Sequence, residues 1–143
     1  MFRVDWERDG YEISTDAVRL DREIVWEFLR TSYWASALPR TVIDRSIDHA
    51  LAFGLYSPSG DQVGFARLVT DHARFAWLSD VFVLDQHRGR GLGTWLVETV
   101  LSHPDLNGIR VMLGTADAQG LYERFGFEPA DPQRVMDRRS DTG

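Results

Sequence analysis

Three glycines and two arginines lie close together between an apolar run and a helical pattern, in the segment DQHRGRGLGT at positions 85–94. Glycines allow several backbone N–H groups to turn toward one ligand, and the helix that follows adds the positive end of its dipole. This combination is typical of a phosphate site, to which Arg88 and Arg90 would add charged contacts and Thr94 a hydroxyl group. The segment therefore predicts anion binding.

The spacing of these glycines narrows the kind of anion site. They fall as G-x-G-x-G, whereas a dinucleotide-binding loop needs G-x-G-x-x-G and an ATP loop ends in Gly-Lys followed by Ser or Thr. Neither of those two loops is present. The remaining alternative to a phosphate site is a tight strand-to-helix turn that binds nothing.

Two segments of the chain resemble those of one protein family. VFVLDQHRGRGLGTWLVETVL is similar to the acetyl-CoA-binding segment of the GNAT acyltransferase superfamily, with Arg88, Gly91 and Gly93 matching its Arg/Gln-x-x-Gly-x-Gly/Ala pattern. TADAQGLYERFGF resembles the family's later block, in which a helix with a Leu-Tyr pair runs into Gly-Phe. The likeness extends over residues 11–136, and SYWASALPR and VGFARLVTD are similar to a small bacterial branch.

The resemblance implies a fold and a co-substrate. The fold is an α/β structure in which helices cover both faces of a mixed, mostly antiparallel sheet with a splayed parallel pair. The co-substrate is acetyl-CoA: its pantetheine arm would lie beside a bulged strand, whose backbone would also polarise the thioester oxygen. The implied cofactor residues are Val81, Phe82, Val83, Arg88, Gly89, Arg90, Gly91, Leu92, Gly93, Thr94, Thr115 and Asp117, with Thr115 standing where many members have asparagine.

The resemblance supplies one candidate catalytic group, and the strand before the glycine segment supplies another. Tyr122 matches the family tyrosine that commonly acts as general acid toward the CoA sulfur, and its phenol is protonated at neutral pH; the alternative is a half-buried structural aromatic. Asp80 interrupts an apolar strand and is the candidate general base, directly or through water. Equally, Asp80 is a structural carboxylate bonded to a neighbouring arginine.

The residues that would bind the acceptor amine are harder to identify from the sequence. Tyr33 and Trp34, in the implied acceptor wall, offer a flat surface for a cation, although core packing explains either aromatic alone. Asp71 and His72 are weaker candidates for base or substrate recognition, since a turn-stabilising aspartate beside a surface histidine explains them too. The histidines show no metal-ligand spacing with one another, so we expect no metal.

The pattern of apolar residues predicts the elements that hold these groups. Strands are expected over residues 11–14, 51–56, 63–70, 75–84 and 109–113, with a last strand from Phe127. Helices are expected from Asp21 to near Tyr33, over 41–49, after the glycine segment up to Pro104, and through Tyr122 to Gly126. Strict alternation in the strand over 75–84 puts Asp80 on the face of Leu78 and Phe82.

Composition limits the class of protein. The 143 residues fit a single domain over 1–143, with 137–143 as a loosely held tail. No cysteine and no apolar run of about 18 residues are present, so we expect a cytoplasmic protein with no membrane association. A net charge of −6 disfavours nucleic acid, unless the arginines at 88, 90, 134, 138 and 139 form one basic face.

The expected function is N-acetyl transfer from acetyl-CoA to a primary amine. The acceptor is a small-molecule or peptide amine, and the net charge together with Tyr33 and Trp34 favours a cationic one. The alternative is a non-catalytic acyl-CoA-binding sensor or interaction module that kept the glycine segment without the chemistry. Exposed strand edges also leave room for a homodimer.

Overall fold

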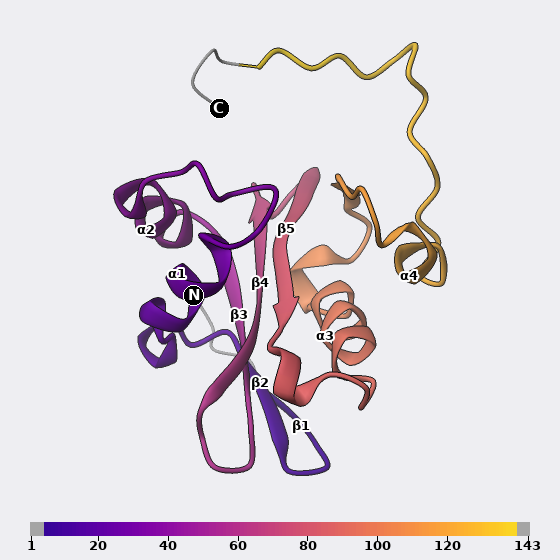
Figure 1. The fold of residues 1–143 in the computed structure, drawn as a ribbon. Coiled ribbons are helices and arrows are strands. Elements are labelled where there is room, and N and C mark those ends of the chain that lie inside the picture. Colours follow the sequence, from indigo (N-terminus) through magenta and orange to yellow (C-terminus); the bar gives the residue numbers. More distant parts are fainter. Residues whose placement is uncertain (1–4, 140–143) are drawn as a thin grey trace.

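Six strands form one sheet and follow one another across it in chain order in the computed structural model, which describes residues 5–139 (Figure 1). They are β1 (Asp5–Arg8), β2 (Tyr11–Ser14), β3 (Leu51–Tyr56), β4 (Gln62–Thr70), β5 (Phe75–Val83) and β6 (Arg110–Leu113). Every neighbouring pair is antiparallel except β5 and β6, which run parallel. The predicted mixed sheet with one parallel pair is therefore confirmed.

Helices cover both faces of this sheet, as predicted (Figure 1). On one side lie α1 (Arg22–Leu29) and α2 (Arg40–Asp48), and on the other lie α3 (Leu92–Leu101) and α4 (Gln119–Glu123). Short 3₁₀ turns stand at Ala17–Arg19, Asp85–His87 and Pro104–Leu106. Within the described residues, no helix is both long enough and apolar enough to cross a membrane.

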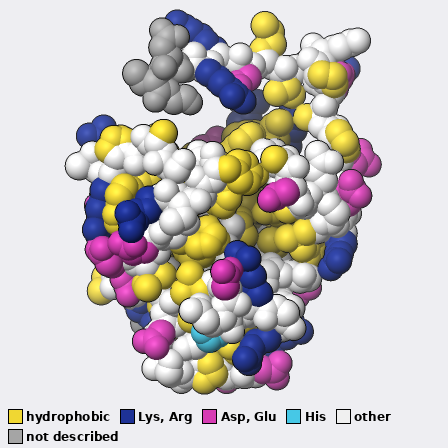
Figure 2. Space-filling view, in the orientation of Figure 1, with side chains coloured by type: hydrophobic (Ala, Val, Ile, Leu, Met, Phe, Trp, Pro, Cys, Tyr) yellow, Lys and Arg dark blue, Asp and Glu magenta, His cyan; other side chains and the backbone are white. Residues whose placement is uncertain are grey.

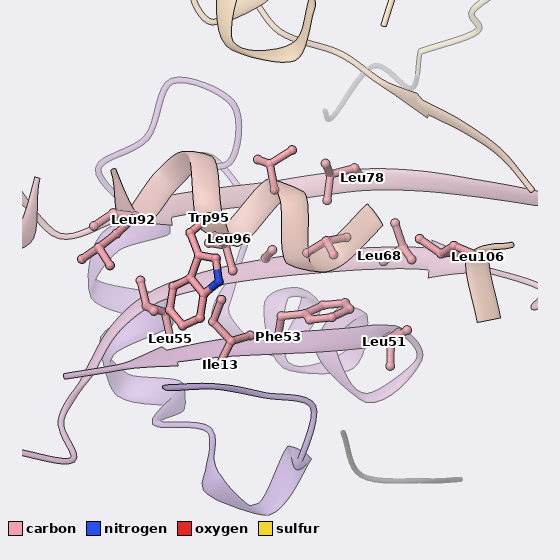
Figure 3. Close-up of a cluster of buried hydrophobic side chains, with 14 of the residues drawn as sticks. Ile13, Leu51, Phe53, Leu55, Leu68, Leu78, Leu92, Trp95, Leu96 and Leu106 are labelled. Atoms are coloured by element: carbon pink, nitrogen blue, oxygen red, sulfur yellow. The ribbon is translucent and has the colours of Figure 1, made fainter. Parts of the chain in front are cut away.

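The larger core lies between the sheet and α3 (Figure 3). Trp95 and Leu96 of α3 point toward Phe53 and Leu55 of β3, and all four side chains are buried. Burial of one such side chain stabilises the fold by about 1.5–3 kcal/mol. This packing holds the first turn of α3, where the glycine segment ends, against the sheet.

A hairpin that the sequence analysis missed begins the fold. β1 and β2 are joined by Asp9 and Gly10, whose φ angles are both positive, 53° and 83°. Two positive φ angles are typical of a type I′ turn, for which Asp-Gly is a preferred sequence. The turn signal was present, but the mostly exposed strand β1 lacks the apolar alternation that identifies a strand.

The first helix ends earlier than predicted, at Leu29 rather than near Tyr33. The hydroxyl groups of Thr31 and Ser32 donate to the carbonyls of Phe28 and Leu29, each at 2.7 Å. Such local side-chain bonds compete with helical hydrogen bonding. Residues 31–38 therefore form a turn-rich connection to α2, and this connection carries Tyr33 and Trp34.

The prediction of a last strand from Phe127 is wrong. Residues 127–139, which we call the arm, form no helix or strand. Pro129 and Pro132 lack the backbone N–H that strand pairing requires, so the first half of the arm is a poor sheet partner. The tail expected at 137–143 begins within the arm, and its residues 140–143 lie outside the described part of the chain.

One buried histidine makes the fold sensitive to acid. The Nδ1 of His103 accepts a hydrogen bond from the Asp105 N–H at 3.1 Å, whereas its Nε2 has no partner among the described residues. Burial lowers the pKa of this ring below its usual 6.5. Below that pH the unfolded chain binds the proton more readily than the folded chain, so the free energy of unfolding should fall as the pH drops.

The variant His103→Asn keeps an acceptor for the Asp105 N–H and removes the titrating ring. It should flatten the fall in unfolding free energy between about pH 7 and about pH 5, measured by urea denaturation. His49→Asn provides a comparison in which a histidine is replaced at an exposed position. An unaltered slope in His103→Asn would contradict the assignment.

Candidate active site

β5 carries a bulge at Asp80. Phe65 of β4 pairs with Phe82, while Arg67 pairs with Ser79, so β5 has one residue more than β4 between these two pairs. Asp80 adopts a φ of 56°, a left-handed conformation that is uncommon outside glycine. The strand before the glycine segment therefore contains the bulge that the family resemblance implies.

The bulge exchanges the two faces of β5, so the predicted strict alternation is wrong. Leu78 lies in the core beneath α3, but Phe82 stacks on Phe28 of α1 with 4.0 Å between ring centroids. One extra residue shifts the period of the side chains by one position. Asp80 consequently faces the α1–α2 connection instead of sharing the face of Leu78.

The parallel strands separate just before the bulge. β5 and β6 pair only as far as Leu78 and Leu113, although β5 continues to Val83. Within the described part of the chain, residues 79–83 therefore have no strand beside them on the β6 side. A free edge of this kind can hydrogen-bond an extended ligand as a further strand would.

A cavity of about 650 Å³ lies where the two strands separate. Figure 2 shows hydrophobic side chains around a recess on this face, below the arm. Its volume is within the range of small-molecule sites, about 300–1,000 Å³. The predicted residues that line it are Tyr33, Trp34, Asp80, Val81, Phe82, Arg88, Thr115, Asp117 and Tyr122.

The glycine segment begins where this cavity reaches Arg88. Gly89 and Gly91 have φ angles of 80° and 75°, and no atom lies within 4 Å of where a Cβ would stand on either residue or on Gly93. No side chain caps the start of α3. The backbone here is therefore open to an anion, which would meet the N–H groups of the first helical turn.

The side chains of the glycine segment differ in their surroundings. The Nε of Arg88 donates to the carbonyl of Val83 at 3.0 Å, and its guanidinium lies 2.9 Å from Asp85. These contacts hold the segment against the end of β5. Leu92 is buried in the core and offers only its backbone, whereas Arg90 is exposed.

Tyr122 projects from α4 into the cavity and is nearly buried, with 9% of the residue exposed. Burial raises the pKa of its phenol above 10, and the charges of Asp117 and Tyr33 add to the shift. Its ring packs edge-on against Phe127. Tyr122 is therefore held as a protonated hydroxyl donor beside the free edge of β5.

Asp80 is engaged by two donors from other elements. One carboxylate oxygen accepts from the Trp34 indole N–H and the other from the Arg67 Nε, both at 2.8 Å. Asp80 is 8% exposed and the Arg67 side chain 16%, so the ion pair is largely shielded from water. Arg67 is thus the neighbouring arginine that the structural alternative for Asp80 required. The Asp80 carboxylate nevertheless lines the cavity, as a general base would have to.

Asp80→Asn should destabilise the fold, because Arg67 would lose its anionic partner in a poorly solvated position. We expect the free energy of unfolding to fall by about 3 kcal/mol, measured by urea denaturation. Asn suits the positive φ of this position, so backbone strain is not added. Asp131→Asn, which breaks the exposed pair with Arg134, should cost under about 1 kcal/mol.

The double variant Asp80→Asn with Arg67→Met tests the cause of that loss. Removing both charged partners should recover part of the stability, since no unpaired guanidinium remains. If the losses of unfolding free energy in the two single variants simply add in the double variant, the ion pair is not what stabilises the bulge.

The α1–α2 connection reaches across the cavity to the segment before α4. The Tyr33 hydroxyl accepts from the Ala116 N–H at 3.2 Å, and its ring meets Trp34 edge-on. The Thr115 hydroxyl accepts from the N–H groups of Asp117 and Ala118, at 3.4 and 3.0 Å. Thr115 thereby shapes the turn that leads into α4.

Asp71 and His72 lie apart from this cavity, among whose lining residues neither occurs. The Asp71 carboxylate accepts from three successive backbone N–H groups, which lower its pKa to about 2. His72 pairs with Asp105 at 3.0 Å. The turn-stabilising interpretation of these two residues is the one their contacts support.

Several cavity residues were missed by sequence reasoning. They include Phe28, Trp77, Ser79 and Arg139 in the lining and Arg67 behind Asp80. A charged residue inside the apolar stretch VGFARLV was the available signal for Arg67. Among residues 5–139, no group of three or more histidine or acidic side chains is placed to hold a metal ion.

Comparisons with known proteins agree with this geometry. Residues 49–129 match the family model for a GNAT acetyltransferase domain. A Gibberella zeae protein assigned as an acetyltransferase is 30% identical over 82% of this chain and 78% of its own length. A crystal structure from Xanthomonas campestris pv. campestris, assigned to the GNAT family, is 44% identical with a TM-score of 0.87, covering 92% of this chain and 94% of that one.

A more distant relative was solved with a ligand. The GNAT family acetyltransferase of Elizabethkingia anophelis, with acetyl-CoA bound, has a TM-score of 0.64 and 15% identity, covering 87% of this chain and 80% of that one. At this identity the likeness concerns the fold.

Proposed function

Because the chain belongs to the GNAT acetyltransferase family, we propose that it transfers an acetyl group from acetyl-CoA to a primary amine of a small molecule or a peptide. The observation that carries this proposal is the meeting of Tyr122 and the bulge at Asp80 in one cavity, next to the open glycine segment.

Three features fit acetyl-CoA as the co-substrate. The uncapped start of α3 suits the pyrophosphate, with the N–H groups of residues 89–94 and the exposed Arg90 as its donors, since the Arg88 N–H already donates to the carbonyl of Asp85. The free edge of residues 79–83 suits the amides of the pantetheine arm. A relative of the same fold was solved with acetyl-CoA bound.

The chain's own groups supply what acyl transfer needs. The thioester brings an activated carbonyl and a thiolate leaving group. The bulge leaves backbone of β5 unpaired with β4, so an N–H near Val81 can donate to the carbonyl oxygen as negative charge develops there. Tyr122, kept protonated by its raised pKa, donates a proton to the departing sulfur.

The amine must lose a proton before it attacks. Both oxygens of Asp80 already accept hydrogen bonds, so we assign Asp80 to act through a water molecule that uses a remaining lone pair. His72, the other candidate base, lies outside the cavity lining.

The acceptor side of the cavity favours a cationic amine. Tyr33, Trp34 and Phe28 form an aromatic group there, with Asp117 and the Arg67-paired Asp80 as the carboxylates of the lining, while its cations are Arg88 of the glycine segment and Arg139 of the arm. Aromatic faces and carboxylates attract an ammonium group, which would approach from the α1–α2 connection.

A thiol-release assay tests the proposal directly. The protein is incubated with acetyl-CoA and a panel of primary amines, and free CoA is followed with a thiol reagent; the chain has no cysteine, so all signal comes from CoA. Mass spectrometry of the acceptor should show one added acetyl group on nitrogen. Acetyl-CoA binding without turnover on any amine would favour the alternative, a non-catalytic acyl-CoA sensor, and absence of binding would refute both.

A further inference from the structure

One side chain connects the glycine segment to a distant part of the molecule. From residue 85 to residue 91 every residue is exposed except His87, which is half-buried. The contacts of Arg88 are with Val83 and Asp85, which come shortly before it in the chain. Among residues 5–139, the hydrogen bond of His87 is the only side-chain hydrogen bond from this stretch to a distant element. His87 is therefore placed to fix the backbone that follows it.

The partner of His87 is Tyr11, at the start of β2. The Tyr11 hydroxyl and the His87 Nδ1 share a hydrogen bond of 2.9 Å across 76 residues, and the two rings meet edge-on with 5.8 Å between their centroids. Either atom can be the donor, depending on which ring nitrogen carries the proton. The β1–β2 hairpin and the segment after β5 lie at the same end of the sheet (Figure 1). This contact therefore joins the glycine segment to a hairpin that does not neighbour β5 in the sheet.

Tyr11 has a fixed position on the hairpin. It is 7% exposed and belongs to the core between the sheet and α3. It directly follows the turn at Asp9 and Gly10, and a Cβ on Gly10 would stand 3.1 Å from the Pro58 side chain. The hairpin turn thus packs closely on the turn between β3 and β4. Because core packing and this turn both hold Tyr11, its hydroxyl group is a rigid support for His87.

We propose, on the basis of the proposed use of acetyl-CoA, that Tyr11 acts through His87 to position the glycine segment for the pyrophosphate. Gly89 and Gly91 allow this backbone many conformations, and only some of them turn its N–H groups toward one anion. The Tyr11–His87 contact restricts these conformations before the ligand arrives, so less conformational entropy is lost on binding. Tyr11 is a positioning residue, since it does not line the cavity where the thioester would react.

Tyr11→Phe removes the hydroxyl group and keeps the ring in the core. Its Kd for acetyl-CoA, measured by NMR titration, should rise about fivefold, the effect of one net hydrogen bond. S-acetylpantetheine, which lacks the pyrophosphate, should bind Tyr11→Phe and the unaltered protein equally. Tyr56→Phe is the matched control, because Tyr56 is also buried and its hydroxyl has no partner among the described residues; it should keep both Kd values.

The two ligands separate positioning from general damage to the site. Equal weakening of acetyl-CoA and S-acetylpantetheine in Tyr11→Phe would overturn the positioning role. An unchanged Kd for acetyl-CoA in this variant would overturn it as well and would leave the proposed function intact. If the unaltered protein bound no acetyl-CoA, the proposed function itself would fail.

Limited digestion with trypsin tests the contact without any ligand. Trypsin cleaves after arginine, and Arg88 and Arg90 are both exposed in the segment. Cleavage after them should be about fivefold faster in Tyr11→Phe and in His87→Leu, because its rate follows the population of released segment. The double variant should be no faster than His87→Leu, since one contact is lost in both. Cleavage after Arg134 of the arm is the internal control and should not change. Equal rates after Arg88 and Arg90 in Tyr11→Phe and the unaltered protein would overturn the proposal.

Discussion

Tyr122→Phe should lower kcat by about 100-fold, a loss within the range observed when a general acid is removed. The departing thiolate would leave without its proton donor, whereas the apolar part of the ring, which packs on Phe127, would remain. The Kd for acetyl-CoA should therefore change little. The measurement pairs steady-state kinetics on the best amine of the panel with calorimetric titration of acetyl-CoA.

Tyr56→Phe is the matched control for this variant. Tyr56 is also buried, burial raises its pKa to about 12, and its hydroxyl has no hydrogen-bond partner among the described residues. It lies on β3, outside the cavity lining. Tyr56→Phe should retain the original kcat, and an equal loss in both variants would remove the special role of Tyr122.

The raised pKa of Tyr122 also leads to an expectation for the pH dependence of kcat. Its phenol acts as a donor only when protonated, so a fall of kcat at alkaline pH that arises from Tyr122 should lie above pH 10. In Tyr122→Phe that alkaline fall should disappear from the residual activity.

Gly93→Glu should weaken acetyl-CoA binding by about 100-fold, equivalent to about 2.7 kcal/mol. The new carboxylate would stand in the first turn of α3, where the pyrophosphate is expected, and repel it. Nothing lies within 4 Å of the Cβ position at Gly93, whose φ is not in the left-handed range. The fold should consequently be unharmed, and the melting temperature should stay the same or rise, as glycine is a poor helix former.

Gly93→Lys separates charge from bulk at the same position. Both side chains are long, but an ammonium group would attract the pyrophosphate, so Gly93→Lys should lose much less affinity than Gly93→Glu. Adding salt should narrow the difference between the two variants, because exposed charges are screened. If both variants lost the same acetyl-CoA affinity and salt did not change these losses, the segment would bind no anion.

Several features of this protein were predictable because they depend on residues that are neighbours in the chain. Gly89, Gly91 and Gly93 give the backbone local freedom to turn its N–H groups toward a ligand, and the helix that follows provides the dipole, so an anion site of the CoA type could be predicted without coordinates. Continuous apolar patterns likewise predicted β3, β4, β5 and α3 at close to their observed bounds. The predicted end of α1 was wrong because the hydroxyl groups of Thr31 and Ser32 bond to backbone carbonyls where the helix was expected to continue.

The candidate site depended on contacts that no local pattern contains. Trp34 and Asp80 are 46 residues apart, and Tyr33 meets Ala116 across 83 residues. The face on which Asp80 lies depends on one extra residue in β5, and that count is defined only by pairing with β4. For this reason, the strict alternation of side chains expected from the sequence assigned Asp80 to the wrong face of β5.

The sequence by itself determined the family, and it predicted the cofactor class and Tyr122 as a residue of the site, because short motifs with constrained backbone carry them. The tertiary structure decided which aromatic residues line the cavity and that Asp80 is paired with Arg67. Each of these results from segments distant in the chain that pack together. The free energy of these contacts depends on the packing of the whole sheet, which no single segment specifies.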